Sequence, residues 1–278
     1  MSERRLTAAD GVDLVYDDLG PPDSVPIVLC HGLAAAAAQF AADAAFFAEF
    51  GYRVLVPDLR GHGRSASPAK LTPATVGIEQ LATDMTAMLD HAGAHSVHWV
   101  GNSLGGIVAL AMLKQQRLRT LATFGTTYAI ELPRIGGHHL VTAARGMLGP
   151  NLLAKVTARH TSDDPAARAL IEAILRQARY DVVAMLAGVL TRYDLVAEAE
   201  AASIPILLLR GGKDRAVNAG LARTLKAMRG RANFTLVDLP GGGHCANLDA
   251  REPFRAALLE FWSSSPVPAP PGGRPSQR

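Results

Sequence analysis

Cysteine is scarce in this chain of 278 residues, which contains only Cys30 and Cys245. Two cysteines are too few for a disulfide framework, and they do not stand at the spacing of metal ligands. The sequence therefore predicts no disulfide-stabilised fold and gives no sign of a metal site or another cofactor. We interpret both thiols as small buried hydrophobic groups.

Long hydrophobic runs and blocks of one charge are also missing. No stretch reaches the roughly 18 apolar residues of a transmembrane helix, and the segment from Met1 to Thr7 lacks the apolar core of a secretory signal. The net charge of +3 comes from scattered arginines rather than from a basic block. We expect a cytoplasmic protein that binds neither membranes nor nucleic acid. The sequence predicts no particular oligomeric state.

Short apolar segments alternate with helical patterns along most of the chain. A turn signal at Asp10-Gly11 predicts a hairpin from residues 4–8 and 12–18. Such an alternation predicts an α/β fold with a mostly parallel central sheet flanked by helices. Further strands are predicted at 26–30, 52–57, 96–100, 119–124, 204–210 and 232–239, and helices at about 38–50, 75–92, 107–116, 216–229 and 246–263.

The alternation stops after the sixth predicted strand. Residues 127–202 are helical in pattern, chiefly at 152–157, 165–175 and 181–202, and contain no convincing strand. We interpret this segment as a helical cap inserted into a core that comprises 1–126 and 203–264. The Ser/Pro/Gly-rich end of the chain, 265–278, is predicted to be a disordered tail.

The motif Gly-Asn-Ser-Leu-Gly occupies residues 101–105, between a predicted strand and a predicted helix. In that setting G-x-S-x-G is typical of a nucleophile elbow, a sharp turn that points the serine hydroxyl off the end of the sheet. Ser103 is therefore the candidate nucleophile. A serine hydroxyl remains a weak nucleophile until a neighbouring base takes its proton, so a base and an acid are expected further along the chain.

Polar residues follow the strand ends at which such partners would lie. Loops that leave the carboxyl ends of parallel strands converge at one edge of the sheet. Four of these loops carry His31-Gly32-Leu33, Ser103, Asp214 and His244. The order Ser, Asp, His along the chain is the one expected of α/β-hydrolases.

With these residues in place, the chain resembles α/β-hydrolase-fold enzymes of the esterase, lactonase and cofactor-free haloperoxidase kind, from about residue 10 to residue 263. The resemblance implies a serine hydrolase that cleaves a small ester or lactone through an acyl-enzyme and needs no cofactor or metal. The motifs that carry it are His31-Gly32, D-x-R-G-x-G-x-S at 58–65, Gly101 to Gly106, Asp214, and His244 with Pro253-Phe254 downstream.

The resemblance also implies a role for each site residue. Ser103 would attack the carbonyl, His244 would take and return the proton, and Asp214 would hold the imidazole in the right tautomer. The backbone N–H groups of Leu33 and Leu104 would form the oxyanion hole.

Several other polar residues have simpler interpretations. Asp238 is a second carboxylate near the site, but its place within a strand favours packing. His31 is expected to order the oxyanion loop through a hydrogen bond. His138-His139 is interpreted as a solvated pair. The charged residues of the 58–65 motif (Asp58, Arg60, His62 and Arg64) are expected to hold a structural turn, and His91, His95, His98 and His160 lack metal-ligand spacing.

Two alternative functions stay open. The elbow also resembles that of C–C bond hydrolases that act on ring-fission products, although Leu33-Ala34 and Cys245 depart from their pattern. A ligand receptor of the same fold with slow turnover is the alternative from another class. Epoxide hydrolases and haloalkane dehalogenases are excluded because their nucleophile is Asp, whereas this chain has Ser103 at the elbow. A cap of this size predicts a mostly apolar pocket over the substrate.

Overall fold

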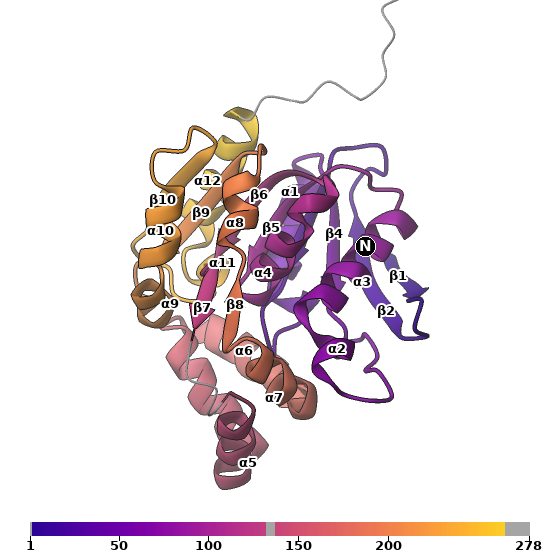
Figure 1. Ribbon diagram of the computed structural model, residues 1–278, viewed down its shortest axis with the longest axis vertical. Coiled ribbons are helices and arrows are strands. Elements are labelled where there is room, and N and C mark those ends of the chain that lie inside the picture. Colours follow the sequence, from indigo (N-terminus) through magenta and orange to yellow (C-terminus); the bar gives the residue numbers. More distant parts are fainter. Residues whose placement is uncertain (1, 132–136, 265–278) are drawn as a thin grey trace, which may run out of the picture.

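The computed structural model describes residues 2–131 and 137–264, and the predicted tail at 265–278 lies outside them. One eight-stranded sheet forms the centre of the molecule, in the order β1-β2-β4-β3-β5-β6-β9-β10 (Figure 1). The predicted hairpin is present, since β1 and β2 pair antiparallel; β2 also pairs antiparallel with β4, and the strands from β4 to β10 are parallel. The strands are β1 (Ser2–Thr7), β2 (Asp13–Leu19), β3 (Pro26–Cys30), β4 (Arg53–Asp58), β5 (Val97–Asn102), β6 (Leu118–Phe124), β9 (Ile206–Gly211) and β10 (Phe234–Leu239).

The central strands are apolar throughout because helices cover both faces of the sheet. In β3, Val28 and Cys30 belong to one apolar core, while Ile27 and Leu29 belong to the other. One face packs against α3 (Ile78–His91), α4 (Leu104–Met112), α8 (Val196–Ala201) and α10 (Ala222–Met228), and the other against α1 (Ala41–Glu49) and α12 (Arg251–Ser264). The predicted α/β fold with a mostly parallel sheet is therefore confirmed.

Several predicted helices are divided in the structure. The segment 38–50 begins as the 3-10 turn η1 (Ala37–Phe40) before α1, and 75–92 is interrupted at Gly77, between α2 (Pro73–Val76) and α3. A side chain at Gly77 would place its Cβ 2.2 Å from the carbonyl oxygen of Pro73, so the close turn requires glycine. The elbow helix ends in the 3-10 turn η2 (Leu113–Gln115). The predicted helix 216–229 forms α9 (Arg215–Gly220) and α10, and the predicted helix 246–263 forms α11 (Ala246–Asp249) and α12.

Of the described helices between β6 and β9 in the chain, the first three lie at one end of the sheet (Figure 1). They are α5 (Gly137–Thr161), α6 (Pro165–Gln177) and α7 (Tyr180–Val189). The expectation that this segment contains no strand is wrong, because β7 (Ala129–Glu131) pairs antiparallel with β8 (Arg192–Asp194). The predicted helix 181–202 is accordingly split into α7, β8 and α8. Three-residue strands are too short to produce a hydrophobic period, which is why the sequence conceals them.

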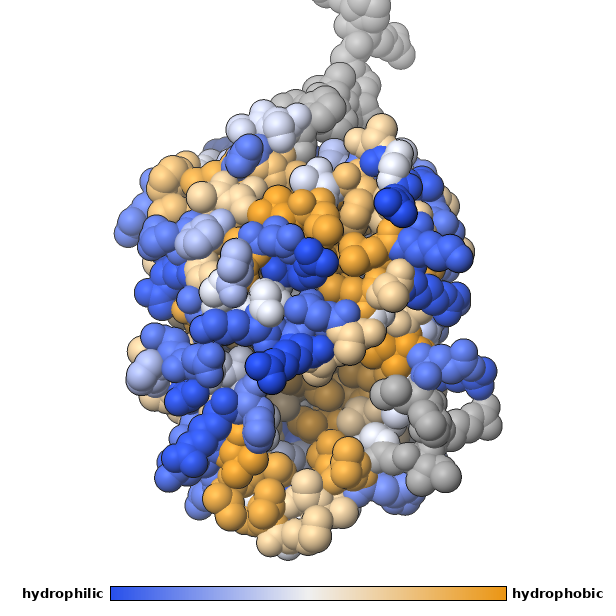
Figure 2. Space-filling model, turned by 90° about the vertical axis from the view of Figure 1, so that its left-hand side faces the viewer, coloured by the Kyte–Doolittle hydropathy of each residue, from blue (hydrophilic) through white to orange (hydrophobic). Residues whose placement is uncertain are grey.

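Helix α5 leaves much of its apolar surface uncovered. Its backbone departs from helical geometry at Gly149, directly before Pro150. Figure 2 shows apolar side chains gathered at the lower end of the molecule, where α5 lies in Figure 1. The side chains of Leu140 and Met147 are 70% and 79% exposed.

Among the described residues, no helix combines the length and the apolar composition that crossing a bilayer would need.

Candidate active site

Ser103 stands in a strained turn between β5 and α4. Its φ of 50° is in the left-handed region, which is costly for a residue with a side chain. The turn is possible because its glycines allow close backbone contact: a Cβ at Gly105 would lie 2.2 Å from the carbonyl oxygen of Cys30, and a Cβ at Gly101 would lie 2.4 Å from the amide of Gly106. The predicted strand-turn-helix setting of the elbow is thus confirmed.

His244 and Asp214 come together at the ends of β10 and β9. The Nδ1 atom of His244 lies 2.8 Å from Oδ2 of Asp214, whose side chain is almost completely buried. Because an ionised carboxylate only accepts hydrogen bonds, this contact places the imidazole proton on Nδ1. The Nε2 atom then has a free lone pair with which it can accept a proton.

Glycines set the distance between the Asp214 and His244 loops. A Cβ at Gly211 would lie 2.6 Å from the carbonyl oxygen of Gly243, so the two loops meet backbone to backbone. The amide of Lys213 donates to the carbonyl of Gly242 at 2.9 Å and fixes that contact. Side chains at these positions would hold Asp214 and His244 apart.

The His244 loop is also held against the elbow. Asn102, the residue before Ser103, donates from Nδ2 to the carbonyl oxygen of His244 at 2.9 Å. Gly125, with φ of +58°, lies so close to the imidazole that a Cβ there would be 3.1 Å from Cε1 of His244. The three residues named by the sequence therefore follow the carboxyl ends of β5, β9 and β10, and Asn102 links the loops that carry Ser103 and His244.

The amides of Leu33 and Leu104 belong to two segments that meet at the Ser103 turn. Leu104 is the first residue of α4, where an amide has no partner within the helix. Within residues 2–131 and 137–264, neither amide donates a hydrogen bond to another protein group. Gly32 brings the Leu33 loop to Ser103, since a Cβ there would lie 3.2 Å from Cβ of Ser103. Both donors are thus available for a ligand beside Ser103.

His31 orders the Leu33 loop, as the sequence analysis predicted. Its Nε2 accepts from the amide of Leu59 at 3.0 Å, so its Nδ1 carries the proton and donates to the carbonyl of Gly32 at 2.8 Å. Burial lowers the pKa of this imidazole, which favours the neutral form that both contacts require. Ala34, three residues after His31, has a φ of 59°, so the backbone of this loop is also in the left-handed region there.

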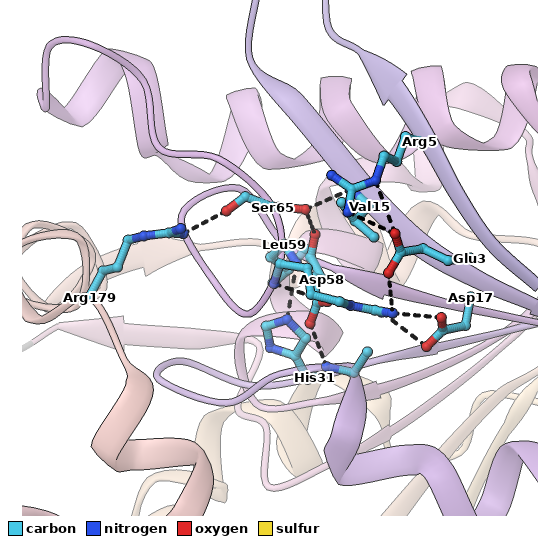
Figure 3. A network of polar contacts seen from close by, with 11 residues as sticks. Glu3, Arg5, Val15, Asp17, His31, Asp58, Leu59, Ser65 and Arg179 are labelled. Carbon is cyan, nitrogen blue, oxygen red and sulfur yellow. Dashed lines mark hydrogen bonds and ion pairs between the residues drawn. The ribbon is translucent and has the colours of Figure 1, made fainter.

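The 58–65 loop is a structural turn, as predicted (Figure 3). Asp58 accepts from the amide of Ala37 at 2.7 Å and from Nε of Arg64 at 2.7 Å, and Ser65 donates to the carbonyl of Asp58 at 2.6 Å. Arg179, which precedes α7, donates to the carbonyl of Ser65 at 2.6 Å. The loop therefore supports the Ala-rich segment after Leu33 and anchors the inserted helices.

A cavity of about 280 Å³ lies between the strand ends and the inserted helices. Gly32, Leu33, Asn102 and His244 border it on the side of the core. The opposite wall is mostly apolar and includes Ile171, Ile174, Leu175 and Val183 from α6 and α7. Cys245 lines the cavity as well, whereas Cys30 is fully buried in the sheet. Burial, with a smaller contribution from Asp249, raises the pKa of the Cys245 thiol to about 12, so it stays protonated.

The remaining candidate residues lie outside this cavity. Asp238 forms a surface ion pair with Arg210, its register partner on β9, at 2.5 Å. His138 and His139 are exposed and contact each other, as predicted. No cluster of three or more His, Cys, Asp or Glu side chains suited to a metal ion occurs in the described part of the chain.

The sequence analysis missed a group of buried amides behind the site. Gln39 and Asn247 hydrogen-bond to each other and, through Gln39, to Asn102. A signal was present, because Gln39 is the single amide in the alanine-rich stretch 34–45. A polar side chain within an apolar segment points to a buried hydrogen-bond network.

Residues 21–250 match the family described as "Serine aminopeptidase, S33". This match covers most of the chain. The chain belongs to this family of α/β-hydrolases. Membership makes it a hydrolase; the chemical bond that it cleaves is a separate question.

A curated relative and two solved structures are similar to this chain over most of its length. The chain is 30% identical over 255 residues, which are 86% of it and 92% of the relative, to a Stutzerimonas stutzeri (strain A1501) protein provisionally named carbamate hydrolase RutD. An esterase from Thermogutta terrifontis matches with a TM-score of 0.80 and 25% identity, over 95% of this chain and 98% of the other. The enol-lactonase from Burkholderia xenovorans LB400 shares the fold, with a TM-score of 0.82 and 23% identity over 94% and 100% of the two chains.

Proposed function

We propose that this S33-family hydrolase cleaves a carboxylic ester or lactone through an acyl-enzyme on Ser103. The observation that supports the proposal best is the 2.8 Å hydrogen bond between His244 and Asp214, which leaves Nε2 of the imidazole free to accept a proton. Asn102, the residue before the strained Ser103 turn, holds the His244 loop against the elbow. A base oriented by a carboxylate next to a serine in this turn is the arrangement that activates a hydroxyl.

In the first half of the proposed reaction, Ser103 Oγ attacks the carbonyl carbon while its proton passes to Nε2 of His244. The bond from that carbon to the leaving oxygen then breaks, and the alkoxide takes the proton from His244. In the second half, water attacks the acyl-enzyme with His244 as the base, which releases the acid and restores the Ser103 hydroxyl. Asp214 stabilises the imidazolium in both halves.

The tetrahedral intermediate carries a negative oxygen that needs donors already aimed at it. The unpaired amides of Leu33 and Leu104 are suited to this task because Leu104 directly follows Ser103 and Gly32 brings the Leu33 loop close to it. One such donor typically contributes about 10²–10³ in rate. Fixed backbone donors need no reorganisation during the reaction.

The cavity favours a small to medium, uncharged substrate. Its volume of about 280 Å³ accommodates a short acyl chain or a small ring. The wall from α6 and α7 is apolar, and the described residues bring no Lys or Arg side chain to the lining. A carboxylate or phosphate on the substrate would therefore be buried without a countercharge.

The test is hydrolysis of p-nitrophenyl acetate, butyrate and octanoate beside γ-butyrolactone and an acyl-homoserine lactone. We expect the wild type to turn over at least one ester or lactone, and Ser103→Ala and His244→Ala to lose about 10⁴–10⁶ in kcat. The rate should fall at acid pH because a protonated imidazole cannot accept the serine proton. Ser96→Ala, a change of an exposed serine, is the control that should keep full activity.

Two outcomes would contradict the proposal. Activity that survives in Ser103→Ala, with a melting curve like that of the wild type, would exclude the acyl-enzyme. A folded wild type that hydrolyses none of these substrates would favour the C–C bond hydrolase, or a receptor if ligands raise the melting temperature without turnover.

A further inference from the structure

A run of consecutive glycines, at 241–243, leads into the proposed base, His244. Glycine gives a backbone more conformational freedom than any other residue, so this loop does not hold its shape by itself. A displacement of about 1 Å at a reacting group can cost about 10² in rate. Contacts from outside the loop must therefore fix the backbone that carries the imidazole.

The peptide group between Gly242 and Gly243 is held at both of its ends. Its carbonyl oxygen accepts from the amide of Lys213, the residue before Asp214, at 2.9 Å. Its N–H, which belongs to Gly243, donates to Oδ2 of Asp249 at 2.9 Å. The C=O and N–H of a trans peptide point in opposite directions, so rotation of this peptide plane would break both hydrogen bonds.

The space around Gly243 is narrow. A Cβ there would lie 2.6 Å from Oδ2 of Asp249 and 2.9 Å from the carbonyl oxygen of Thr161, the last residue of α5. The backbone directly before His244 is therefore in close contact with the Asp249 carboxylate and with the end of α5.

Ser162 fixes the direction of the Asp249 carboxylate. Its Oγ accepts from the amide of Asp164 at 3.0 Å and donates its proton to Oδ1 of Asp249. Ser162 is only 4% exposed, and its carbonyl accepts from Nε of Arg168 at 2.6 Å. Burial raises the pKa of Asp249, and the hydrogen bonds from Ser162 and Gly243 oppose that shift. With Oδ1 engaged by Ser162, Oδ2 is left to accept from Gly243.

We propose that Asp249, oriented by Ser162, is a positioning residue for His244. Its carboxylate holds the amide of Gly243, and this contact keeps the imidazole at hydrogen-bond distance from Asp214. Asp249 acts through the backbone and takes part in no proton transfer. The inference rests on the proposed function, because it assigns His244 as the base of the reaction.

The kinetic test compares Asp249→Ala with Asp249→Asn on the p-nitrophenyl ester that the wild type hydrolyses fastest. Both variants remove the negative charge, but the amide oxygen of asparagine can still accept from Gly243. We expect Asp249→Ala to lower kcat by about 10² and to leave KM within about threefold of the wild type. Asp249→Asn should keep kcat within about threefold.

Two further variants complete the series. Ser162→Ala lets the carboxylate rotate away from Gly243, so we expect it to lower kcat by about tenfold. Glu252→Ala is the control, because Glu252 is an exposed carboxylate in the first turn of α12, the next helix along the chain. It removes a nearby charge and should leave kcat unchanged.

The proton NMR signal of the Nδ1–H group of His244 reports the position of the imidazole without any substrate. A proton between an imidazole and a carboxylate resonates at unusually low field, and its absence in His244→Ala assigns the signal. We expect the signal to move upfield or broaden in Asp249→Ala and to remain in Asp249→Asn.

Several results would overturn the inference. An unchanged kcat and NMR signal in folded Asp249→Ala would show that the loop holds His244 without this carboxylate. Equal losses in Asp249→Asn and Asp249→Ala would assign the effect to charge alone. If Asp249→Ala does not fold, Ser162→Ala decides, and wild-type kcat and NMR signal in that variant contradict the inference. If the wild type hydrolyses no ester, the proposed function fails, and the NMR signals still test the role of Asp249.

Discussion

The strand-end loops and the inserted helices enclose one cavity, but they are built from different interactions. The loops place their polar groups by short hydrogen bonds, such as those of Asp58 and of the His244 and Asp214 pair. The helices contribute apolar side chains, while Arg179, just before α7, and Val182 contact the 58–65 loop. Hydrogen bonds can hold reacting atoms in fixed positions, whereas an apolar wall tolerates replacement of its side chains by others of similar volume. We infer that the loops govern the reaction and the helices govern substrate choice.

The largest expected effect tests the loop side of this comparison. Asp214→Asn should lower kcat by about 10⁴, because the amide can donate to Nδ1 and stabilise the wrong tautomer of His244. Asp238→Asn, which changes the exposed carboxylate on β10, should alter kcat less than twofold. Steady-state kinetics on one p-nitrophenyl ester checks both. Equal losses in the two variants would show that the acid has been misassigned.

The second effect concerns the stability of the loops. Asp58→Ala should lower the free energy of unfolding by about 3 kcal/mol, because it leaves the amide of Ala37 and Nε of Arg64 without their acceptor. Glu3→Ala removes an exposed partner of the same Arg64 and should cost under about 0.5 kcal/mol. Urea unfolding measures both changes. A change at Asp58 no larger than that at Glu3 would refute the structural role of the 58–65 turn.

The third effect contrasts a histidine of the sheet with one of the inserted helices. Burial lowers the pKa of His98 to about 4, whereas the pKa of an unfolded histidine is about 6.5. Between these values the unfolded chain binds more protons, so stability falls as pH falls from 6.5 to 4. His98→Asn should reduce the loss between pH 7 and pH 4 by about 3 kcal/mol. His138 is exposed, so His138→Asn should leave the pH dependence of the free energy of unfolding unchanged. Identical curves of unfolding free energy against pH for the two variants would contradict the difference in burial.

The smallest effect tests the helix side. Ile174 borders both the cavity of about 280 Å³ and a neighbouring one of about 190 Å³. Ile174→Ala should join them and raise the ratio of octanoate to butyrate hydrolysis by about tenfold, with kcat on acetate nearly unchanged. Leu170→Ala, which opens only the second cavity, is the control and should shift the ratio less. An unchanged ratio in Ile174→Ala would mean that the helices do not select the acyl chain.

The parts of the site that the sequence predicts well depend on local chemistry. The elbow at 101–105 follows from its own glycines, and the hydrogen bond from His31 to Gly32 joins adjacent residues. The parts that escaped prediction depend on residues far apart in the chain. Gln39 and Asn247 meet only because α11 packs beside η1, and no spacing in the sequence announces that contact.

The sequence by itself determined the alternation of strands and helices, the strained position of Ser103 and the chain order of Ser103, Asp214 and His244. These features rest on backbone preferences and hydrophobic periods, which act over a few residues. Only the tertiary structure decided the pairing of β7 with β8, the meeting of the glycine loops that joins Asp214 to His244, and the hydrogen bond from Gln39 to Asn102. Such contacts bring together groups from distant segments, and packing of the whole chain selects them.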